Sequence, residues 1–294
     1  MKMTHLLLAL LIMIIWGLNF SITKVGLESI NPLILAGIRF LLCALPAIFL
    51  VGLPRTLWRH VASYGLLFGV GVWGLVNLGI SSGLSAGIAS LVLQTSAFFS
   101  IAMGVWFCRE SFNRVQLYGM LIAALGLASV LLIDDGSVTF DGLILVVVGA
   151  FALGAANIII KKADTREVFN FLVWASLFAP LPLFALELLL NGTQGFTSLA
   201  TQLDNAAITS ILFQVYPNTL FAYWVWNTLL NQYSVSTVAP LTLLVPVFGM
   251  LGSILIFNEA ITPDKVVAAT LILLGLAVGL YGRWLRPTPG VINT

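Results

Sequence analysis

The stretch IASLVLQTSAFFSIAMGVWFCRESFNRVQ, residues 88–116, has a counterpart later in the chain, VAPLTLLVPVFGMLGSILIFNEAITPDK, residues 238–265. Both stretches are long apolar runs that end at a glutamate, Glu110 in the first and Glu259 in the second. A further apolar run follows each of them. This match indicates that the chain is built from two copies of one unit.

The composition is that of a membrane protein. Of the 294 residues, 60% are hydrophobic and 8% are charged, and the mean hydropathy is +1.07. Soluble domains carry about 25% charged residues, whereas apolar runs long enough to cross a bilayer as helices recur along this chain. The net charge of +2 argues against a nucleic-acid partner. The two cysteines stand apart from each other, and no motif predicts a metal site or a cofactor.

The apolar runs predict an all-α polytopic membrane protein with ten transmembrane helices in the lipid bilayer. The predicted spans are residues 6–23, 33–53, 62–80, 84–107, 115–133, 142–160, 168–190, 208–230, 237–257 and 266–285. Five spans fall in each copy, so the first repeat covers residues 6–133 and the second covers 142–285. Because five is odd, the second copy enters the membrane from the opposite side, which makes the repeats inverted.

The basic residues predict the orientation in the membrane. With the N-terminus in the cytoplasm, nearly all Lys and Arg residues between spans fall on the cytoplasmic side, and only Lys24 and Lys265 fall outside. This asymmetry follows the positive-inside rule. The even number of spans then places both termini in the cytoplasm.

Several stretches carry a recognisable pattern. They are WGLNFSITKVGL (16–27), LAGIRFLLCALPAIF (35–49), AGIASLVLQTSAFFSI (86–101), FCRE (107–110) and APLTLLVPVFGMLGSILIFNEAIT (239–262). These motifs resemble the EamA-type branch of the drug/metabolite transporter superfamily, and most closely its bacterial exporters of O-acetylserine and cysteine. The resemblance implies ten helices, two EamA repeats, cytoplasmic termini, a place in the bacterial inner membrane and export of small metabolites.

Polar side chains inside spans are candidates for substrate contact, because they are costly in lipid and usually face the bundle interior or a watery cavity. In the first span, Trp16 and Asn19 share one helix face. The repeat aligns Asn19 and Lys24 with Asn157 and Lys162. Asn19 and Asn157 are therefore expected either to bind substrate or to make hydrogen bonds between helices.

Arg39 is a basic residue within a predicted span, about seven residues past Pro32 and so roughly 10 Å from the outer end of that span. A guanidinium at that depth can pair with the carboxylate of a small amino-acid-like zwitterion. It can equally neutralise Glu28 or bind carbonyls at a helix end. The matching place in the second copy lies near Trp174, so we expect an asymmetric site.

The fourth and ninth spans are the two stretches quoted at the start. Gln94 and Thr95 sit near mid-depth of the fourth span, where they are candidates to bind a zwitterion. Pro240 and Pro246 predict an interruption in the ninth span. The fourth span has no proline at the matching places, so we expect a break in one half only.

The eighth span is the most polar and aromatic of the ten. The α-helical period places Tyr216, Tyr223 and Asn227 on one face, with Trp226 beside it. Aromatic walls suit a cavity for small, partly apolar solutes. A belt of aromatic residues at the membrane surface is the alternative interpretation.

These features together predict an exporter of small metabolites that works by alternating access through a central cavity lined by the candidate residues. Amino acids or derivatives such as cysteine and O-acetylserine are the expected cargo. Aromatic amino acids, drug-like compounds or a lipid-linked group are the alternatives. No motif of a hydrolase occurs, and the only two histidines fall in cytoplasmic segments, so an enzyme is not expected.

Overall fold

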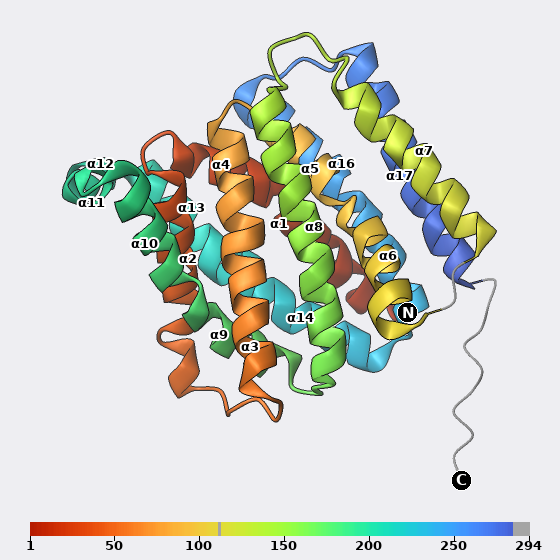
Figure 1. Ribbon diagram of the computed structural model, residues 1–294, viewed down its shortest axis with the longest axis horizontal. Coiled ribbons are helices and arrows are strands. Elements are labelled where there is room, and N and C mark those ends of the chain that lie inside the picture. The colour runs from red at the N-terminus through yellow and green to blue at the C-terminus, as the bar shows by residue number, and fades with distance from the viewer. Residues whose placement is uncertain (111–112, 285–294) are drawn as a thin grey trace.

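The computed structural model describes residues 1–110 and 113–284, which form a bundle of helices (Figure 1). The first half contains α1 (Met3–Leu27), α2 (Pro32–Ala44), η1 (Ala47–Phe49), α3 (Trp58–Gly65), η2 (Leu66–Gly74), α4 (Leu75–Ser81), α5 (Ala86–Leu93), α6 (Ser96–Cys108) and α7 (Arg114–Val130). The second half contains α8 (Phe140–Ala163), α9 (Val168–Ala175), η3 (Ser176–Phe178), α10 (Pro180–Asn191), α11 (Gln194–Thr197), α12 (Leu199–Gln202), α13 (Asn205–Phe213), η4 (Gln214–Phe221), α14 (Ala222–Gln232), α15 (Val235–Val238), η5 (Ala239–Leu243), α16 (Leu244–Phe257) and α17 (Pro263–Trp284). Residue 285, the last of the predicted second repeat, lies outside the described residues.

The described residues contain eight helices that are long and apolar enough to cross a membrane. Two further segments fall short of that measure: α7 has 17 residues, and the stretch α13–η4–α14 is more polar. Each predicted span overlaps one of these ten helical segments. The prediction of an all-α polytopic membrane protein is confirmed.

Polar caps fix where several helices begin. The side chain of Asn31 accepts a hydrogen bond from the backbone N–H of Leu33, with Pro32 at the first helical position of α2. Ser85 caps α5 and Asp204 caps α13 in the same way. Since the first N–H groups of a helix have no intrahelical partner, these caps satisfy backbone groups at the ends of the apolar segments.

Corresponding segments of the two halves pack against each other in antiparallel fashion. Along α7 and α17, Gly119 contacts Gly279 while Gly126 contacts Ile272, so the residue number rises on one helix as it falls on the other. Helices α5 and α16 contact each other in the same sense. In Figure 1, α7 and α17 lie side by side at the edge of the bundle.

The fourth span is interrupted, as the ninth is. Helix α5 ends at Leu93 and α6 begins at Ser96, while in the second half the 3-10 segment η5 leads into α16. The side-chain amide of Gln94, in the first break, donates to the backbone carbonyl of Thr242, in the second, at 2.8 Å. The expectation of a break in one half only is therefore wrong. A break without proline is possible here because the hydroxyl of Thr95 donates to the carbonyl of Val92 at 2.7 Å and so satisfies a backbone group that the break leaves free.

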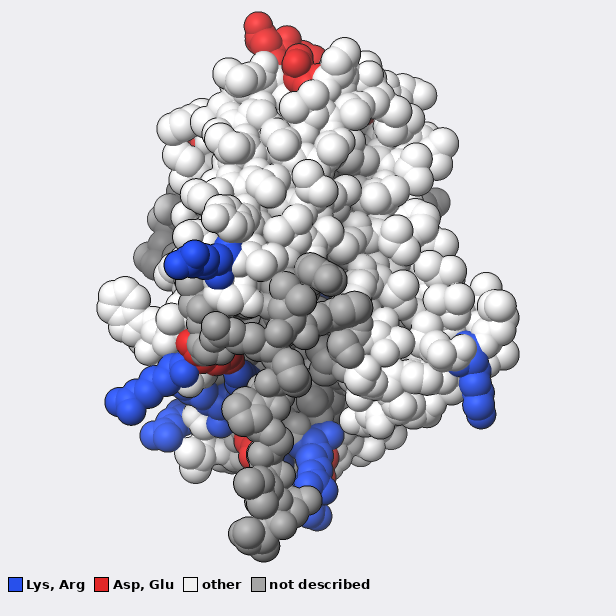
Figure 2. Space-filling view, turned by 90° about the vertical axis from the view of Figure 1, so that its right-hand side faces the viewer, with Lys and Arg blue, Asp and Glu red and all other residues white. Residues whose placement is uncertain are grey.

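The basic residues gather at one end of the bundle, which we call the basic end. It is defined by Lys2, Arg55, Arg59, Arg109, Arg114, Lys161, Lys162 and Arg166, which lie where α1, α3, α7 and α9 begin and where α6 and α8 end. Figure 2 shows one face of the molecule, with most of the Lys and Arg atoms in its lower half and acidic atoms at its upper tip. This distribution matches the predicted charge asymmetry.

The opposite end is held by an ion pair between Lys265 of α17 and Asp135, in the connection between α7 and α8, with Nζ and Oδ2 2.8 Å apart. Burial raises the pKa of the Asp135 carboxyl, but hydrogen bonds from Lys265 and Ser137 outweigh it and hold the pKa at about 2, below its ordinary value of 3.8. The ionised carboxylate therefore stabilises the fold above the ordinary pKa, and that contribution is lost as the pH falls toward 2.

We predict that Asp135→Asn lowers the thermal unfolding midpoint of the detergent-solubilised protein at neutral pH. The difference from the wild type should shrink as the pH falls toward 2, because the wild-type carboxylate is then protonated. Asp134→Asn is the matched control, since Asp134 makes no ion pair among the described residues. A difference that stays constant with pH would contradict this account.

The seam between α7 and α17 leaves no room for a side chain at Gly275. A Cβ atom there would lie 2.6 Å from the backbone nitrogen of Ala123 and 2.6 Å from the carbonyl oxygen of Gly119. We predict that Gly275→Leu lowers the thermal unfolding midpoint, as overpacking costs about 1–3 kcal/mol. Ala277→Leu, at an exposed position of the same helix, should leave the midpoint unchanged.

Candidate functional site

The guanidinium of Arg39 lies at the centre of a polar and aromatic cluster. Its side chain is 1% exposed, and its Nη2 donates to the hydroxyl of Thr219 at 3.1 Å. The guanidinium carbon lies 4.0 Å from the centroid of the Trp73 ring and 5.4 Å from that of Phe40. Arg39 makes no ion pair among the residues that the structure describes. Arg39 therefore neither neutralises Glu28 nor binds carbonyls at a helix end among these residues.

Arg39 is only partly satisfied by the surrounding protein. Its Nε and Nη1 have no hydrogen-bond partner. The same holds for further buried polar atoms of the interior: Asn19 Nδ2 and Oδ1, Trp73 Nε1, Gln214 Oε1, Asn218 Oδ1 and Asn227 Nδ2. Buried polar groups are nearly always hydrogen-bonded in native proteins. These atoms are buried without a hydrogen-bond partner, and one of them belongs to Trp73, whose ring lies over the guanidinium.

The segment η4 gives this region its shape. It is a π-helix with Pro217 inside it, and the hydroxyl of Thr219 donates to the carbonyl of Gln214 at 2.7 Å, five residues back. The indole N–H of Trp16 donates to the carbonyl of Asn218 at 3.2 Å. The matching segment of the first half, η2, is also a π-helix. Short π-helical stretches within α-helices are frequent at functional sites.

An aromatic wall adjoins Arg39. The ring of Trp16 lies 5.2 Å from that of Tyr223 and 5.3 Å from that of Trp226, between ring centroids. Tyr223 lies 6.1 Å from Phe68, which in turn contacts Trp73 at 6.5 Å. The structure thus brings Trp16, Tyr223 and Trp226 together, and the wall continues through Phe68 to Trp73, whose ring covers the guanidinium.

Tyr216 does not join this wall. It is 49% exposed, and no hydrogen bond or ring contact joins it to the cluster within the described residues. The α-helical period placed Tyr216 on the face of Tyr223, but a π-helix closes its hydrogen bonds over five residues instead of four. The extra residue in each turn changes the register, so Asn218 and Thr219 are buried and Tyr216 faces outward.

The two predicted asparagines have different surroundings. Asn19 is fully buried, whereas Asn157 is exposed and donates to the hydroxyl of Ser100 at 3.1 Å. Trp174 also lies away from the cluster: its indole N–H donates to the carbonyl of Gly52 at 3.1 Å, and its ring contacts Trp58 at 5.7 Å. These interactions hold Trp174 to the connection between η1 and α3.

Gln94 and Thr95 belong to the break in the fourth span. Gln94 bonds Thr242, as described above, and the hydroxyl of Thr95 donates to the carbonyl of Val92 at 2.7 Å. Asn227 is half-buried on α14, one residue after Trp226. The structure therefore surrounds Arg39 with only part of the predicted set, and it ties Gln94 and Thr95 to backbone groups.

Sequence reasoning missed the residues that cover Arg39. Trp73, whose ring covers the guanidinium, lies in the π-helix η2, and Thr219 lies in η4. A signal was present in both stretches, because glycines recur within the first, in FGVGVWG, and a proline interrupts the second, in VYPNT. Glycine and proline inside an apolar span often mark places where the helix departs from regular geometry.

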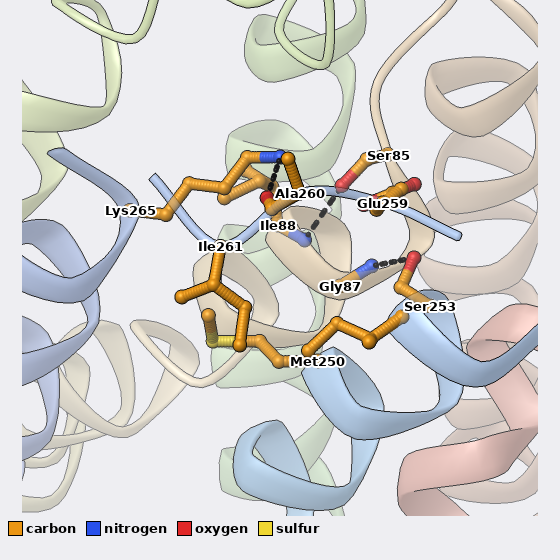
Figure 3. A pocket seen from close by; sticks show the side chains of 10 residues that line it. Ser85, Gly87, Ile88, Met250, Ser253, Glu259, Ala260, Ile261 and Lys265 are labelled. Atoms are coloured by element: carbon orange, nitrogen blue, oxygen red, sulfur yellow. Dashed lines mark hydrogen bonds between the residues drawn. The ribbon is translucent and has the colours of Figure 1, made fainter. Parts of the chain in front are cut away.

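A cavity lies apart from this cluster, between the first turn of α5 and the last turn of α16 (Figure 3). Its volume is about 10 Å³, which is room for about one water molecule. Its lining includes Ser85, Met250, Ser253, Glu259 and Lys265, and none of the predicted site residues. The Lys265 side chain that lines it is the one that bonds Asp135 and the carbonyl of Ala260.

The two-copy pattern of the chain matches a known family. The model of the EamA-like transporter family matches residues 3–132 and again residues 141–281. The chain belongs to this family. Since its members are transporters, the prediction that the protein is not an enzyme is confirmed, as is the resemblance inferred from the motifs.

Individual relatives cover nearly the whole chain. A protein of Salmonella typhimurium described as a "Probable amino-acid metabolite efflux pump" is 37% identical over 97% of this chain and 97% of its own length. A protein of Escherichia coli with the same description is 37% identical over 94% of this chain and 95% of its own. A solved structure described as "Crystal structure of protein" matches with a TM-score of 0.63 at 16% identity, over 98% of this chain and all of that one, which supports the fold.

We predict that replacing Arg39 with methionine leaves the fold intact or makes it more stable. An arginine at the centre of a membrane helix costs roughly 2.5–3.5 kcal/mol on insertion scales. A cation–π contact returns about 0.5–2 kcal/mol of this, and two nitrogens remain unpartnered. Thermal unfolding of Arg39→Met in detergent checks the prediction. A large fall in the midpoint would mean that Arg39 holds the fold together instead of awaiting a ligand.

Proposed function

We propose that this protein exports small amino-acid-like metabolites, amino acids or derivatives such as cysteine and O-acetylserine, across the bacterial inner membrane. The observation that carries the proposal is the buried guanidinium of Arg39, which has two unpartnered nitrogens and no carboxylate beside it. A cargo with a carboxylate supplies what this group lacks. The amino-acid metabolite efflux described for the two relatives supports the same cargo class.

The geometry of Arg39 suits a bidentate carboxylate. Thr219 accepts from Nη2, which has a second N–H, and both Nη1 and Nε are free. One edge of the planar guanidinium thus keeps two parallel N–H groups, the arrangement that binds a carboxylate in fork-to-fork fashion. Hydrogen bonds to charged groups are worth about 1.5–3 kcal/mol. The carboxylate end of the cargo is therefore the part that Arg39 recognises.

The remainder of the cargo meets polar acceptors and aromatic rings. Asn19, Gln214 and Asn218 each present a buried oxygen without a partner, and such oxygens can accept hydrogen bonds from an ammonium group. The rings of Trp16 and Tyr223 offer an apolar surface to a side chain. This wall also favours a second candidate cargo, an aromatic amino acid or a drug-like compound with an acidic group.

We further propose that all ten helical segments cross the bilayer as two inverted repeats, residues 6–133 and 142–285, with both termini in the cytoplasm. The antiparallel packing of α7 on α17 and of α5 on α16 supports inversion. The gathering of Lys and Arg at the basic end supports the orientation. Transport then proceeds by alternating access, in which the two halves exchange conformations around the Arg39 cluster.

Transport into proteoliposomes tests the cargo. Labelled cysteine, O-acetylserine and tryptophan are each compared with their carboxyl amides, which keep the side chain and the amine but lose the charge that Arg39 binds. We predict that Arg39→Met slows transport of the free acid by about 10- to 100-fold, which corresponds to a hydrogen bond to a charged group. Amides should be poor cargo for the wild type.

Two controls make the result specific. Tyr216→Phe changes an exposed residue of the same segment as Thr219 and should keep the wild-type rate. Arg39→Lys keeps the charge but loses the planar fork and should recover only part of the rate. The proposal fails if Arg39→Met transports free acids as fast as the wild type, or if the amides compete equally well with the acids.

A further inference from the structure

Among the described residues, ion pairs that join the two halves include two that stand at equivalent places at opposite ends of the bundle. Lys24, near the end of α1, has its Nζ 3.4 Å from Oε1 of Glu259, which follows α16. Lys161, near the end of α8, pairs with Oε1 of Glu110, which follows α6. In each pair the lysine comes from one half and the glutamate from the other, so each pair bridges the two repeats.

The two glutamates stand at equivalent places in the backbone. Arg109 directly follows α6 and Asn258 directly follows α16, and both residues have a left-handed backbone with φ of 53°. Such a residue turns the chain sharply at a helix end. In each half the glutamate comes directly after it, so the same local geometry sets the direction of both carboxylates.

The helices that carry the pairs also cross in the same way. A Cβ atom on Gly17 would lie 2.8 Å from the backbone nitrogen of Gly249, and one on Gly154 would lie 3.1 Å from that of Ser100. Each lysine follows its glycine by seven residues, and each glutamate follows the contacted residue by ten. By these contacts Lys161 is the structural counterpart of Lys24, whereas the sequence alignment paired Lys24 with Lys162, the next residue.

The two pairs differ in their exposure to solvent. The side chains of Lys24 and Glu259 are 30% and 16% exposed, whereas those of Lys161 and Glu110 are 52% and 29% exposed. Glu259 also lines the cavity between α5 and α16 shown in Figure 3. A Cβ on Gly104, by contrast, would lie 2.8 Å from Oε2 of Glu110, so that carboxylate packs directly on its own helix. Both pairs are formed together in this structure.

From this matched arrangement we infer that the two ion pairs are the latches of the transport cycle. Lys24–Glu259 closes the outer end, Lys161–Glu110 closes the inner end, and each half-cycle opens one latch while the other remains closed. The inference rests on the proposed alternating-access function. It assigns to four charged residues at the ends of the bundle the control of access to the Arg39 cluster.

Cys43 can report access to the Arg39 cluster, because its thiol is fully buried and it lies one helical turn after Arg39 on α2. In a Cys108→Ser background, a membrane-impermeant maleimide applied to intact cells reports outward opening. Applied to inside-out vesicles, it reports inward opening. We predict that Glu259→Gln speeds labelling from outside by about fivefold, the population shift that corresponds to about 1 kcal/mol for a lost ion pair. Glu110→Gln should speed labelling from inside to a similar degree.

Each variant has a control. Lys24→Glu combined with Glu259→Lys reverses the charges and should restore the slow labelling from outside. Glu167→Gln removes a third pair, with Arg55, whose atoms are 3.8 Å apart and whose arginine is 91% exposed, and it should leave labelling from both sides unchanged.

Wild-type proteoliposomes run in parallel separate the two ideas. Failure of the wild type to transport any cargo would end the proposed function. If the wild type transports cargo but Glu259→Gln and Glu110→Gln both change labelling from the same side, the latch proposal alone is overturned. The same holds if neither variant changes labelling. Labelling of the charge-reversed protein at the rate of Glu259→Gln would overturn the latch proposal as well.

Discussion

The fold depends on one constraint: a backbone within lipid has no water to bind, so every carbonyl freed by an irregular helix needs a protein partner. Three such partners lie inside this bundle. Gln94 binds the carbonyl of Thr242, Thr219 binds that of Gln214, and Trp16 binds that of Asn218. Many of the polar side chains inside the spans thus support the interrupted segments. The irregular segments, in turn, bring the two halves into contact at the centre.

Arg39 stands out because the backbone does not account for it. Thr219 is the only hydrogen-bond partner of its guanidinium in the described part of the chain, and an aromatic ring covers one face. Burial of an unpaired charge is unfavourable unless another interaction offsets it. Under the proposed function, the carboxylate of a bound cargo supplies that interaction, and its binding stabilises the state in which the cluster closes around it.

The sequence predicted the features that follow from residue type, such as apolar length and buried charge. It predicted less well the features that depend on helix register and on contacts between distant segments. Apolar length located the ten helical segments, and the cost of charge in lipid singled out Arg39. The predicted position of Tyr216 was wrong because Pro217 signals an irregular helix but does not specify the π-helical register that turns Tyr216 outward. The break at Gln94 was missed because its partner lies more than a hundred residues away. Trp73 and Thr219 become recognisable only once η2 and η4 are placed beside α2.

The seam between α7 and α17 has a further meaning. Ala123 of α7 contacts Gly275, and Gly126 contacts Ile272. The spacing that aligns Glu110 with Glu259 also aligns Gly126 with Gly275 and Ala123 with Ile272, so the same two positions meet twice with their roles exchanged. This reciprocity defines an isologous contact, the kind that joins identical subunits across a two-fold axis. Within this single chain, the seam between α7 and α17 therefore has the contact pattern of a two-fold interface, with the matching helix of each half presenting the same positions to the other.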